Sequence, residues 1–220
     1  MTTTAETVIA ALIGSFQRGQ QIERPYRHWL LSNSLPEGMG DELTSLPFPP
    51  PALGGVSGKR ELHNATRKYF DVENRSRYPV VEAFAQALQS RSVTRAVEDR
   101  FGARLSGTYL RLEYAQDTGG FWLEPHTDLG VKAFTMLLYL SRDAAHRDLG
   151  TDIYDADQRH VGRSPFEPSA AMVFVPSRDT FHGFEPRTIE GVRKSIIINY
   201  VTNEWRAREQ LSFPDRPIAA

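Results

Sequence analysis

Apolar residues recur at helical spacing in the N-terminal half of the chain. Val8, Leu12 and Phe16 are spaced by four and predict an amphipathic helix from residue 5 to about residue 16. Residues 78–101 repeat steps of three and four and predict a helix followed by a second, short one. We expect these helices to pack on the outside of a larger core.

Two segments between the predicted helices have a different pattern. Residues 24–36, RPYRHWLLSNSLP, predict a short strand that enters a turn. Residues 46–60, LPFPPPALGGVSGKR, are rich in Pro and Gly, and the prolines prevent regular strand pairing. A loop of this length is typical of a lid or of a segment that faces substrate.

The C-terminal half has the alternating pattern of β-strands. Five short β-type runs are separated by Gly, Pro, Asp and Ser: residues 107–115, 133–141, 150–155, 170–176 and 193–201. Helices followed by strands favour an α+β fold built on an antiparallel sandwich or barrel over a doubly wound parallel sheet. A chain of 220 residues suits one compact domain of this kind.

Composition limits the possible chemistry and partners. The sequence contains no cysteine, so any metal must bind nitrogen and oxygen ligands. The formal charge of −1, without long runs of either sign, predicts neither nucleic-acid binding nor membrane binding. The N-terminus does not resemble a signal peptide and no stretch approaches the roughly 20 apolar residues of a membrane span, so we expect a cytoplasmic protein.

Two of the six histidines lie in a context that indicates metal binding. His126 and Asp128 form an i, i+2 pair, and extended backbone directs both side chains to one face. His182 follows Asp128 by 54 residues, just after a predicted strand, and a later strand of an antiparallel sandwich can lie beside an earlier one. Two histidines and one carboxylate form the facial triad of non-haem Fe(II) oxygenases. The remaining histidines are interpreted as ordinary surface or core residues: His28, His63, His146 and His160.

A candidate anion clamp follows His182. Arg193 and Ser195 share one face of the last predicted strand, where a guanidinium beside a hydroxyl can bind a carboxylate. Lys194 is an alternative cation for this clamp. Strand alternation directs Lys194 to the opposite face, however, and the pairing with Ser195 favours Arg193.

The ordered set of His-x-Asp, a distal His and Arg-x-Ser resembles the 2-oxoglutarate/iron(II)-dependent oxygenase superfamily, particularly its small prolyl-4-hydroxylase-like bacterial members. The resemblance spans residues 107–201 and implies a double-stranded β-helix, or jelly-roll, core with N-terminal and supporting helices. It implies a single oxygenase domain over residues 1–220. Residues 1–106 would supply helical and loop support, residues 107–202 the core with the iron site, and residues 203–220 a C-terminal extension.

The resemblance also implies roles for individual residues. His126, Asp128 and His182 would hold Fe(II). Arg193, assisted by Ser195, would bind the distal carboxylate of 2-oxoglutarate.

Four further residues are weaker candidates, two from the resemblance and two from their position in the sequence. Tyr114 and Tyr139 fall at positions where tyrosines of the superfamily line the cosubstrate pocket, although core packing explains both residues equally well. Trp122 is a candidate wall of the substrate pocket, with simple packing as the alternative. Arg67 is a candidate partner for an anionic substrate group, with a solvated basic helix face as the alternative.

The activity that the resemblance implies is hydroxylation of an unactivated C–H bond in a small molecule such as an amino acid, a sugar or a natural-product-like compound. Fe(II), 2-oxoglutarate and O2 would be required, succinate and CO2 would be released, and ascorbate would serve as reductant in vitro. The carboxylate of Asp128 favours hydroxylation over halogenation and leaves desaturation or cyclisation open. Two alternatives are a peptidyl, prolyl-type hydroxylase and a non-catalytic, cupin-like protein that binds a metal or ligand. The sequence does not predict an oligomeric state.

Overall fold

A computed structural model describes residues 3–51, 58, 67–128 and 130–219. The helices are α1 (Ala5–Arg18), α2 (Met39–Thr44), α3 (Val72–Arg77), α4 (Pro79–Gln89) and α5 (Arg91–Phe101), with the 3-10 turns η2 (Ala144–His146) and η3 (Arg208–Gln210). The first strands are β1 (Gln20–Ile22), β2 (His28–Leu31), β3 (Lys68–Tyr69), β4 (Tyr109–Asp117), β5 (Leu123–His126) and β6 (Lys132–Tyr139). The later strands are β7 (Asp152–Tyr154), β8 (His160–Arg163), β9 (Ala171–Phe174), β10 (His182–Phe184) and β11 (Arg193–Val201).

The predicted helices are confirmed as α1, α4 and α5, and local capping explains their ends. Thr4 and Thr7 form a reciprocal capping box that satisfies free backbone N–H groups at the start of α1. Ser90 accepts from Val93 N at the start of α5, and Gly102 ends that helix with a φ of 74°, a conformation that glycine adopts without steric cost. Each helix then buries one apolar stripe, as its spacing predicts.

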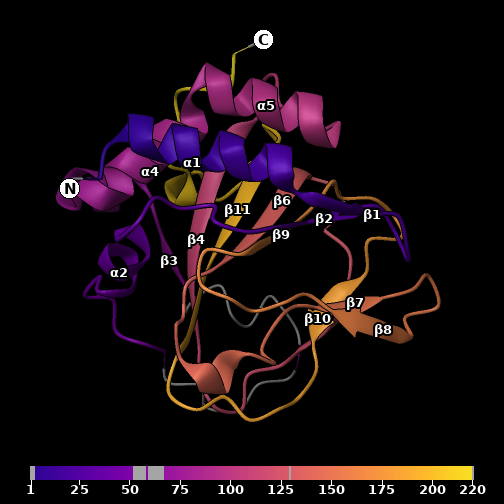
Figure 1. Cartoon of the computed structure of the whole chain (residues 1–220). Helices are drawn as coiled ribbons and strands as arrows, with labels where there is room; N and C mark the ends of the chain where they lie inside the picture. The colour runs from indigo at the N-terminus through magenta and orange to yellow at the C-terminus, as the bar shows by residue number, and fades with distance from the viewer. Residues whose placement is uncertain (1–2, 52–57, 59–66, 129, 220) are drawn as a thin grey trace.

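The described strands form two antiparallel sheets, a seven-stranded one in the order β1-β2-β9-β6-β11-β4-β3 and a four-stranded one in the order β5-β10-β7-β8. From β4 to β11 the chain crosses repeatedly from one sheet to the other, which is the jelly-roll connectivity. All five predicted β-runs are strands, and the predicted α+β class is confirmed. Figure 1 shows the large sheet beneath α1, α4 and α5, with β7, β8 and β10 set apart on its other side.

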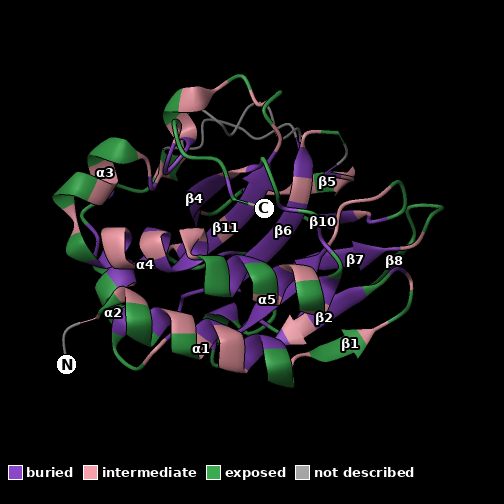
Figure 2. Cartoon of the chain, turned by 90° about the horizontal axis from the view of Figure 1, so that it is seen from above, coloured by how far each residue is buried: buried purple, intermediate pink, exposed green. Residues whose placement is uncertain are grey.

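Period-two alternation divides the large sheet into two faces with different neighbours. Met136 and Leu138 of β6 belong to the core that the helices cover, whereas Leu137 and Tyr139 belong to the core between the sheets. Figure 2, viewed from above, shows the helices with exposed outer surfaces over buried central strands. The face toward the small sheet is therefore the one on which a site enclosed by both sheets must lie.

The large sheet also contains strands from residues 1–106, the segment that was expected to supply helical and loop support. β2, the predicted strand at residues 24–36, pairs with β9, and β1 extends that edge. β3 pairs with β4 at the opposite edge. Most of the Pro/Gly-rich loop, together with His63, falls at residues 52–57 and 59–66, outside the described residues.

Membrane insertion was not expected from the sequence. Among the described residues, no helix has both the length and the apolar character that crossing a bilayer requires.

Candidate metal centre

Two histidines meet across the small sheet. β5 and β10 are antiparallel, and His126 and His182 are register partners in their pairing. The centroids of the two imidazole rings lie 4.3 Å apart. Strand pairing between segments more than 50 residues apart thus brings both rings to one point.

Each imidazole is oriented by its own backbone. Nδ1 of His126 lies 3.0 Å from the carbonyl oxygen of Glu124, and Nδ1 of His182 lies 3.0 Å from the carbonyl oxygen of Thr180. A carbonyl oxygen only accepts, so in both rings Nδ1 carries a hydrogen, and Nε2 is the nitrogen that offers a lone pair when the imidazole is neutral. A backbone contact of this type is the usual support for a metal-binding histidine.

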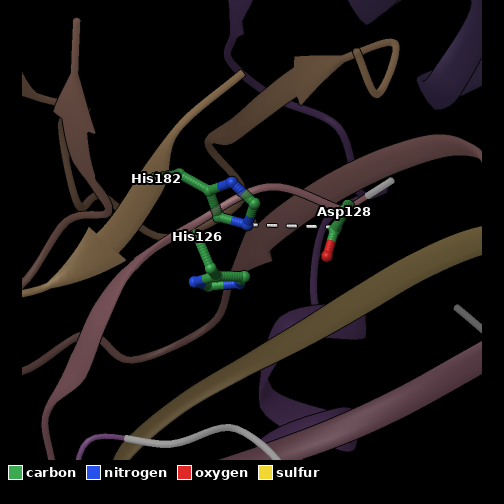
Figure 3. Close-up of side chains that lie close together, drawn as sticks. All are labelled: His126, Asp128 and His182. Atoms are coloured by element: carbon green, nitrogen blue, oxygen red, sulfur yellow. Dashed lines mark ion pairs between the residues drawn. The ribbon is translucent and has the colours of Figure 1, made fainter. Parts of the chain in front are cut away.

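Asp128 completes a three-residue cluster. Its Oδ2 lies 3.9 Å from Nε2 of His182, and one ligand atom of each residue, His126 included, lies within 4.8 Å of the others. Figure 3 shows the two rings one above the other, with the carboxylate facing them from the side. Two imidazole nitrogens and one carboxylate oxygen on one side of a shared point match the donor set of a facial triad, and these residues fit a divalent ion.

The carboxylate of Asp128 is almost fully enclosed, with 2% of its side chain exposed, and it has donors on both oxygens. Nζ of Lys132 lies 2.6 Å from Oδ1, and Oγ1 of Thr135 donates to Oδ2 at 2.9 Å. A carboxylate oxygen has two lone pairs, so Oδ2 can accept from Thr135 and still bind a metal. Oδ2 is therefore the oxygen of Asp128 that would bind a metal ion in this cluster.

A second group of potential ligands, Asp152, His160 and Glu185, has a different character. Oδ1 of the buried Asp152 accepts from Arg163, and Oδ2 accepts from Arg187 and from the backbone N–H of Glu185. Burial alone would raise the pKa of Asp152, but these hydrogen bonds outweigh it and lower the pKa. With a guanidinium on each oxygen, Asp152 is the centre of a buried ion-pair network, and it does not line the cavity that the first cluster shares.

The triad opens into a cavity between the two sheets. Its walls come from the inward faces of β4, β6 and β11, and Arg193, Ser195 and Tyr139 line it together with the triad. Strand alternation places Lys194 on the other face, where Nζ donates to the carbonyl oxygen of Thr44. The structure thus brings the predicted clamp and the predicted triad into one cavity and leaves Lys194 outside it.

Arg193 is held by two fixed acceptors. Its Nε donates to the carbonyl oxygen of Leu149, and its Nη1 donates to Oδ2 of Asp117. Among the described residues, Nη2 has no hydrogen-bond acceptor, and the side chain lines the cavity. A guanidinium fixed in this way offers its remaining N–H groups to an anion without further loss of side-chain freedom.

The two tyrosines lie on opposite faces of the large sheet. Tyr139 lines the cavity, and its hydroxyl contacts Oγ1 of Thr151 and Oγ of Ser164. Tyr114 lies in the core beneath the helices, donates to the carbonyl oxygen of Leu43, and does not line the cavity. The pocket position expected for Tyr114 therefore differs from its location, because alternation along β4 turns its side chain away from the site.

The two candidate substrate residues also separate. Arg67 lines the cavity and forms ion pairs with Asp117 and Glu113, so it does not lie on the solvated helix face that was the alternative interpretation. Trp122 lies beside Gly58, outside the walls formed by the described residues. The expected substrate wall at Trp122 is thus not part of this cavity.

Sequence reasoning missed three charged residues of the site, Glu113, Asp117 and Lys132. Glu113 and Asp117 lie on one face of β4, and both line the cavity. Both residues could have been found from the sequence. Carboxylates at positions i and i+4 of a strand share one face, and when that face is buried they require buried cations as partners. Lys132 carried a weaker signal, four residues after Asp128, where sequence spacing in a loop fixes no contact.

Comparison with known proteins supports the fold. No protein-family model matches the chain, and no curated protein matches it in sequence. Among solved structures, the chain is similar to a prolyl 4-hydroxylase of Phytophthora capsici, with a TM-score of 0.60, 14% identity, and coverage of 94% of this chain and 68% of that one. It is also similar to a Trichoplax adhaerens prolyl hydroxylase in complex with a peptide fragment of the oxygen degradation domain of hypoxia inducible factor, with a TM-score of 0.60, 16% identity, and coverage of 92% and 93%.

A third similar structure is the viral collagen prolyl hydroxylase of Paramecium Bursaria Chlorella virus-1 in its 2OG complex. It has a TM-score of 0.56 and 12% identity, over 80% of this chain and 96% of that one. Identities this low establish shared architecture and not shared activity. The resemblance inferred from the sequence is thus confirmed at the level of the fold: this chain has the jelly-roll architecture of the prolyl 4-hydroxylases.

Proposed function

We propose that the chain is an Fe(II)- and 2-oxoglutarate-dependent oxygenase that hydroxylates an unactivated C–H bond. One observation carries this proposal: the His126, Asp128 and His182 cluster shares a cavity with a fixed guanidinium, that of Arg193. A metal-binding jelly-roll protein without catalysis needs the triad, but it has no use for a carboxylate clamp facing it. The shared fold with prolyl 4-hydroxylases supports the same conclusion.

The residues of the chain have separate tasks in this proposal. His126, His182 and Oδ2 of Asp128 would hold the iron, and Arg193 with Ser195 would anchor the distal carboxylate of 2-oxoglutarate. When bound, iron and cosubstrate supply the oxidising chemistry, with release of succinate and CO2. Leu137, Ile197 and Phe184 give the cavity apolar walls that exclude water from the reacting atoms.

The test is formation of succinate by the purified protein with Fe(II), ascorbate, 2-oxoglutarate and O2. We expect slow turnover without substrate, lost in His126→Ala and retained in the matched control His160→Gln, because His160 lies outside the cavity. Absence of both turnover and 2-oxoglutarate binding in the unmodified protein would contradict the proposal and favour the cupin-like alternative.

For the substrate we propose a small polar molecule such as an amino acid or a sugar. The charged side chains of Arg67, Glu113 and Asp117 line the cavity beside its apolar walls, and such groups orient a polar ligand. A prolyl peptide is the second candidate, because the solved structures of similar fold are named as prolyl hydroxylases. A screen for substrate-stimulated succinate release separates the two, with free amino acids and sugars in one set and proline-containing peptides in the other.

A further inference from the structure

Lys132 occupies an unusual position for a lysine, next to a metal-ligand carboxylate inside the protein. It begins β6, and only 5% of its side chain is exposed. Its Nζ lies 2.6 Å from Oδ1 of Asp128, the oxygen that does not face His182. A buried lysine charge requires a partner of opposite sign, and here that partner is the residue assigned to the metal.

The other oxygen of Asp128 is fixed by a directional chain of hydrogen bonds. Arg111 has only donors, so Oδ1 of Asn199 must face it, and Nδ2 of Asn199 then donates to Oγ1 of Thr135 at 3.0 Å. The hydroxyl of Thr135 in turn donates to Oδ2 of Asp128 at 2.9 Å. Asp128 is thus held on both oxygens by the protein itself, so its orientation does not depend on Lys132 alone.

From this arrangement we infer that Lys132 acts as a built-in counter-ion of Asp128, which stabilises the metal-free site and lowers its affinity for the metal ion. The inference rests on the proposed function, because it requires a divalent cation at the triad. Without metal, the ammonium compensates the buried carboxylate, and the pair is neutral. With metal bound, the same ammonium lies close to a second cation and repels it.

The two effects form one thermodynamic cycle. Replacing Lys132 by a neutral side chain removes the ammonium charge that pairs with Oδ1 of Asp128 in the metal-free protein, whereas in the metal-bound protein the ion itself would compensate the carboxylate. The substitution therefore destabilises the metal-free state more than the metal-bound state. By linkage, the neutral variant must bind the metal more tightly than the unmodified protein. Lys132 is accordingly a positioning and charge-tuning residue that does not itself touch substrate.

The experiment measures binding of Mn(II), used alone as a redox-stable probe, to the full chain prepared free of metal. Calorimetric titration gives Kd, and thermal unfolding with and without Mn(II) gives the shift in Tm. For Lys132→Met we expect a lower Tm without metal, a larger rise in Tm on adding Mn(II), and a Kd at least about tenfold lower than in the unmodified protein. A Kd equal to or higher than that of the unmodified protein would overturn the inference.

Two further variants separate charge from geometry. Lys132→Gln removes the charge but keeps a donor for Oδ1, so a charge effect gives tighter binding and a purely geometric role gives unchanged binding, which contradicts the inference. Lys194→Met is the matched control, because it makes the same change at a lysine whose Nζ lies outside the cavity. It should leave Kd and the Mn(II)-dependent rise in Tm unchanged, and a change like that of Lys132→Met would overturn the inference.

Failure of the inference and failure of the proposed function give different results. If the unmodified protein does not bind Mn(II), or if His126→Ala binds it equally well, the metal site itself is wrong and both proposals fail. If the unmodified protein binds Mn(II) at the triad and Lys132→Met does not bind it more tightly, the inference alone fails. Should Lys132→Met fold only in the presence of Mn(II), the cycle is confirmed in its extreme form. Should it not fold at all, Lys132→Gln decides.

Discussion

Arg193 and Asp117 are register partners between β11 and β4, and an ion pair joins their side chains on the cavity face. The other oxygen of Asp117 lies 2.8 Å from Nη1 of Arg67. One carboxylate thus fixes two guanidiniums, one from β11 and one from the segment that precedes β3. All three side chains are less than 10% exposed, so water screens the attraction between their charges only weakly.

Arg193→Lys should weaken the binding of 2-oxoglutarate while keeping a positive charge in the cavity. A lysine cannot donate at once to Leu149, to Asp117 and to a bound carboxylate in the planar fork that Arg193 provides. Loss of charge-assisted hydrogen bonds of about 3 kcal/mol in total corresponds to a KM about 100-fold higher. The KM for 2-oxoglutarate is measured from the rate of succinate release at varied 2-oxoglutarate concentration.

Lys194→Ala is the control for this prediction, since it changes the neighbouring cation on the opposite face of the same strand. Its KM for 2-oxoglutarate should match that of the unmodified protein. If Lys194→Ala raised KM and Arg193→Lys did not, the assignment of the carboxylate clamp would be reversed.

Asp117→Asn should lower the free energy of unfolding by about 3 kcal/mol, because it leaves the two buried guanidiniums without their shared counter-charge. Urea unfolding followed by circular dichroism measures the change. Asp41→Asn is the matched surface variant, since the side chains of Arg142 and Asp41, which form an ion pair, are 62% and 60% exposed. It should change the free energy of unfolding by less than about 0.5 kcal/mol.

The sequence predicted the large sheet better than the small one, and the reason lies in the length of the strands. β4, β6 and β11 have eight or nine residues each, enough for alternation and β-type composition to be recognised. β5 and β10 have four and three residues, so their pairing depends on contacts distant in sequence. The cluster of His126, Asp128 and His182 was nevertheless predicted, because residue types and their order indicate a candidate metal site without knowledge of the strands, and the structure brings the three residues together.

Local strand alternation also explains why the sequence placed some site residues correctly and others on the wrong face. Alternation along β11 separated Arg193 from Lys194 correctly in advance, since the hydroxyl of Ser195 marked one face. Along β4 no polar residue was used in the same way to identify the face that lines the cavity. Tyr114 was therefore expected in the cavity, although Glu113 and Asp117 line it and Tyr114 lies on the opposite face. Lys132 reaches Asp128 through a loop, and its contact requires the three-dimensional structure.

Tyr139→Phe and Tyr114→Phe should separate binding from stability. Removing the hydroxyl of Tyr139, which lines the cavity, should raise KM for 2-oxoglutarate about tenfold, because a hydroxyl that can donate to a bound carboxylate is lost. Removing the hydroxyl of Tyr114 should leave KM unchanged and lower the free energy of unfolding by about 1 kcal/mol, since its bond to Leu43 lies in the core. Steady-state kinetics and urea unfolding of both variants test this, and equal effects on KM would contradict the assignment of the two faces.

Asp152 should make the stability of the protein depend on pH in the acid range. Its folded-state pKa lies below the ordinary value of 3.8, because the hydrogen bonds from Arg187, Glu185 N–H and Arg163 outweigh the cost of burial. A depressed pKa means that the stabilisation is fully present above pH 3.8 and is lost as the pH falls through the folded-state pKa. Asp152→Asn should therefore be less stable than the unmodified protein by about 3 kcal/mol at pH 7, and this difference should shrink below pH 4. Urea unfolding at pH 7, 5, 4 and 3 measures the difference, with the exposed Asp157→Asn as control. A difference that stays constant down to pH 3 would contradict the assignment of this stabilisation to the ionised carboxylate of Asp152.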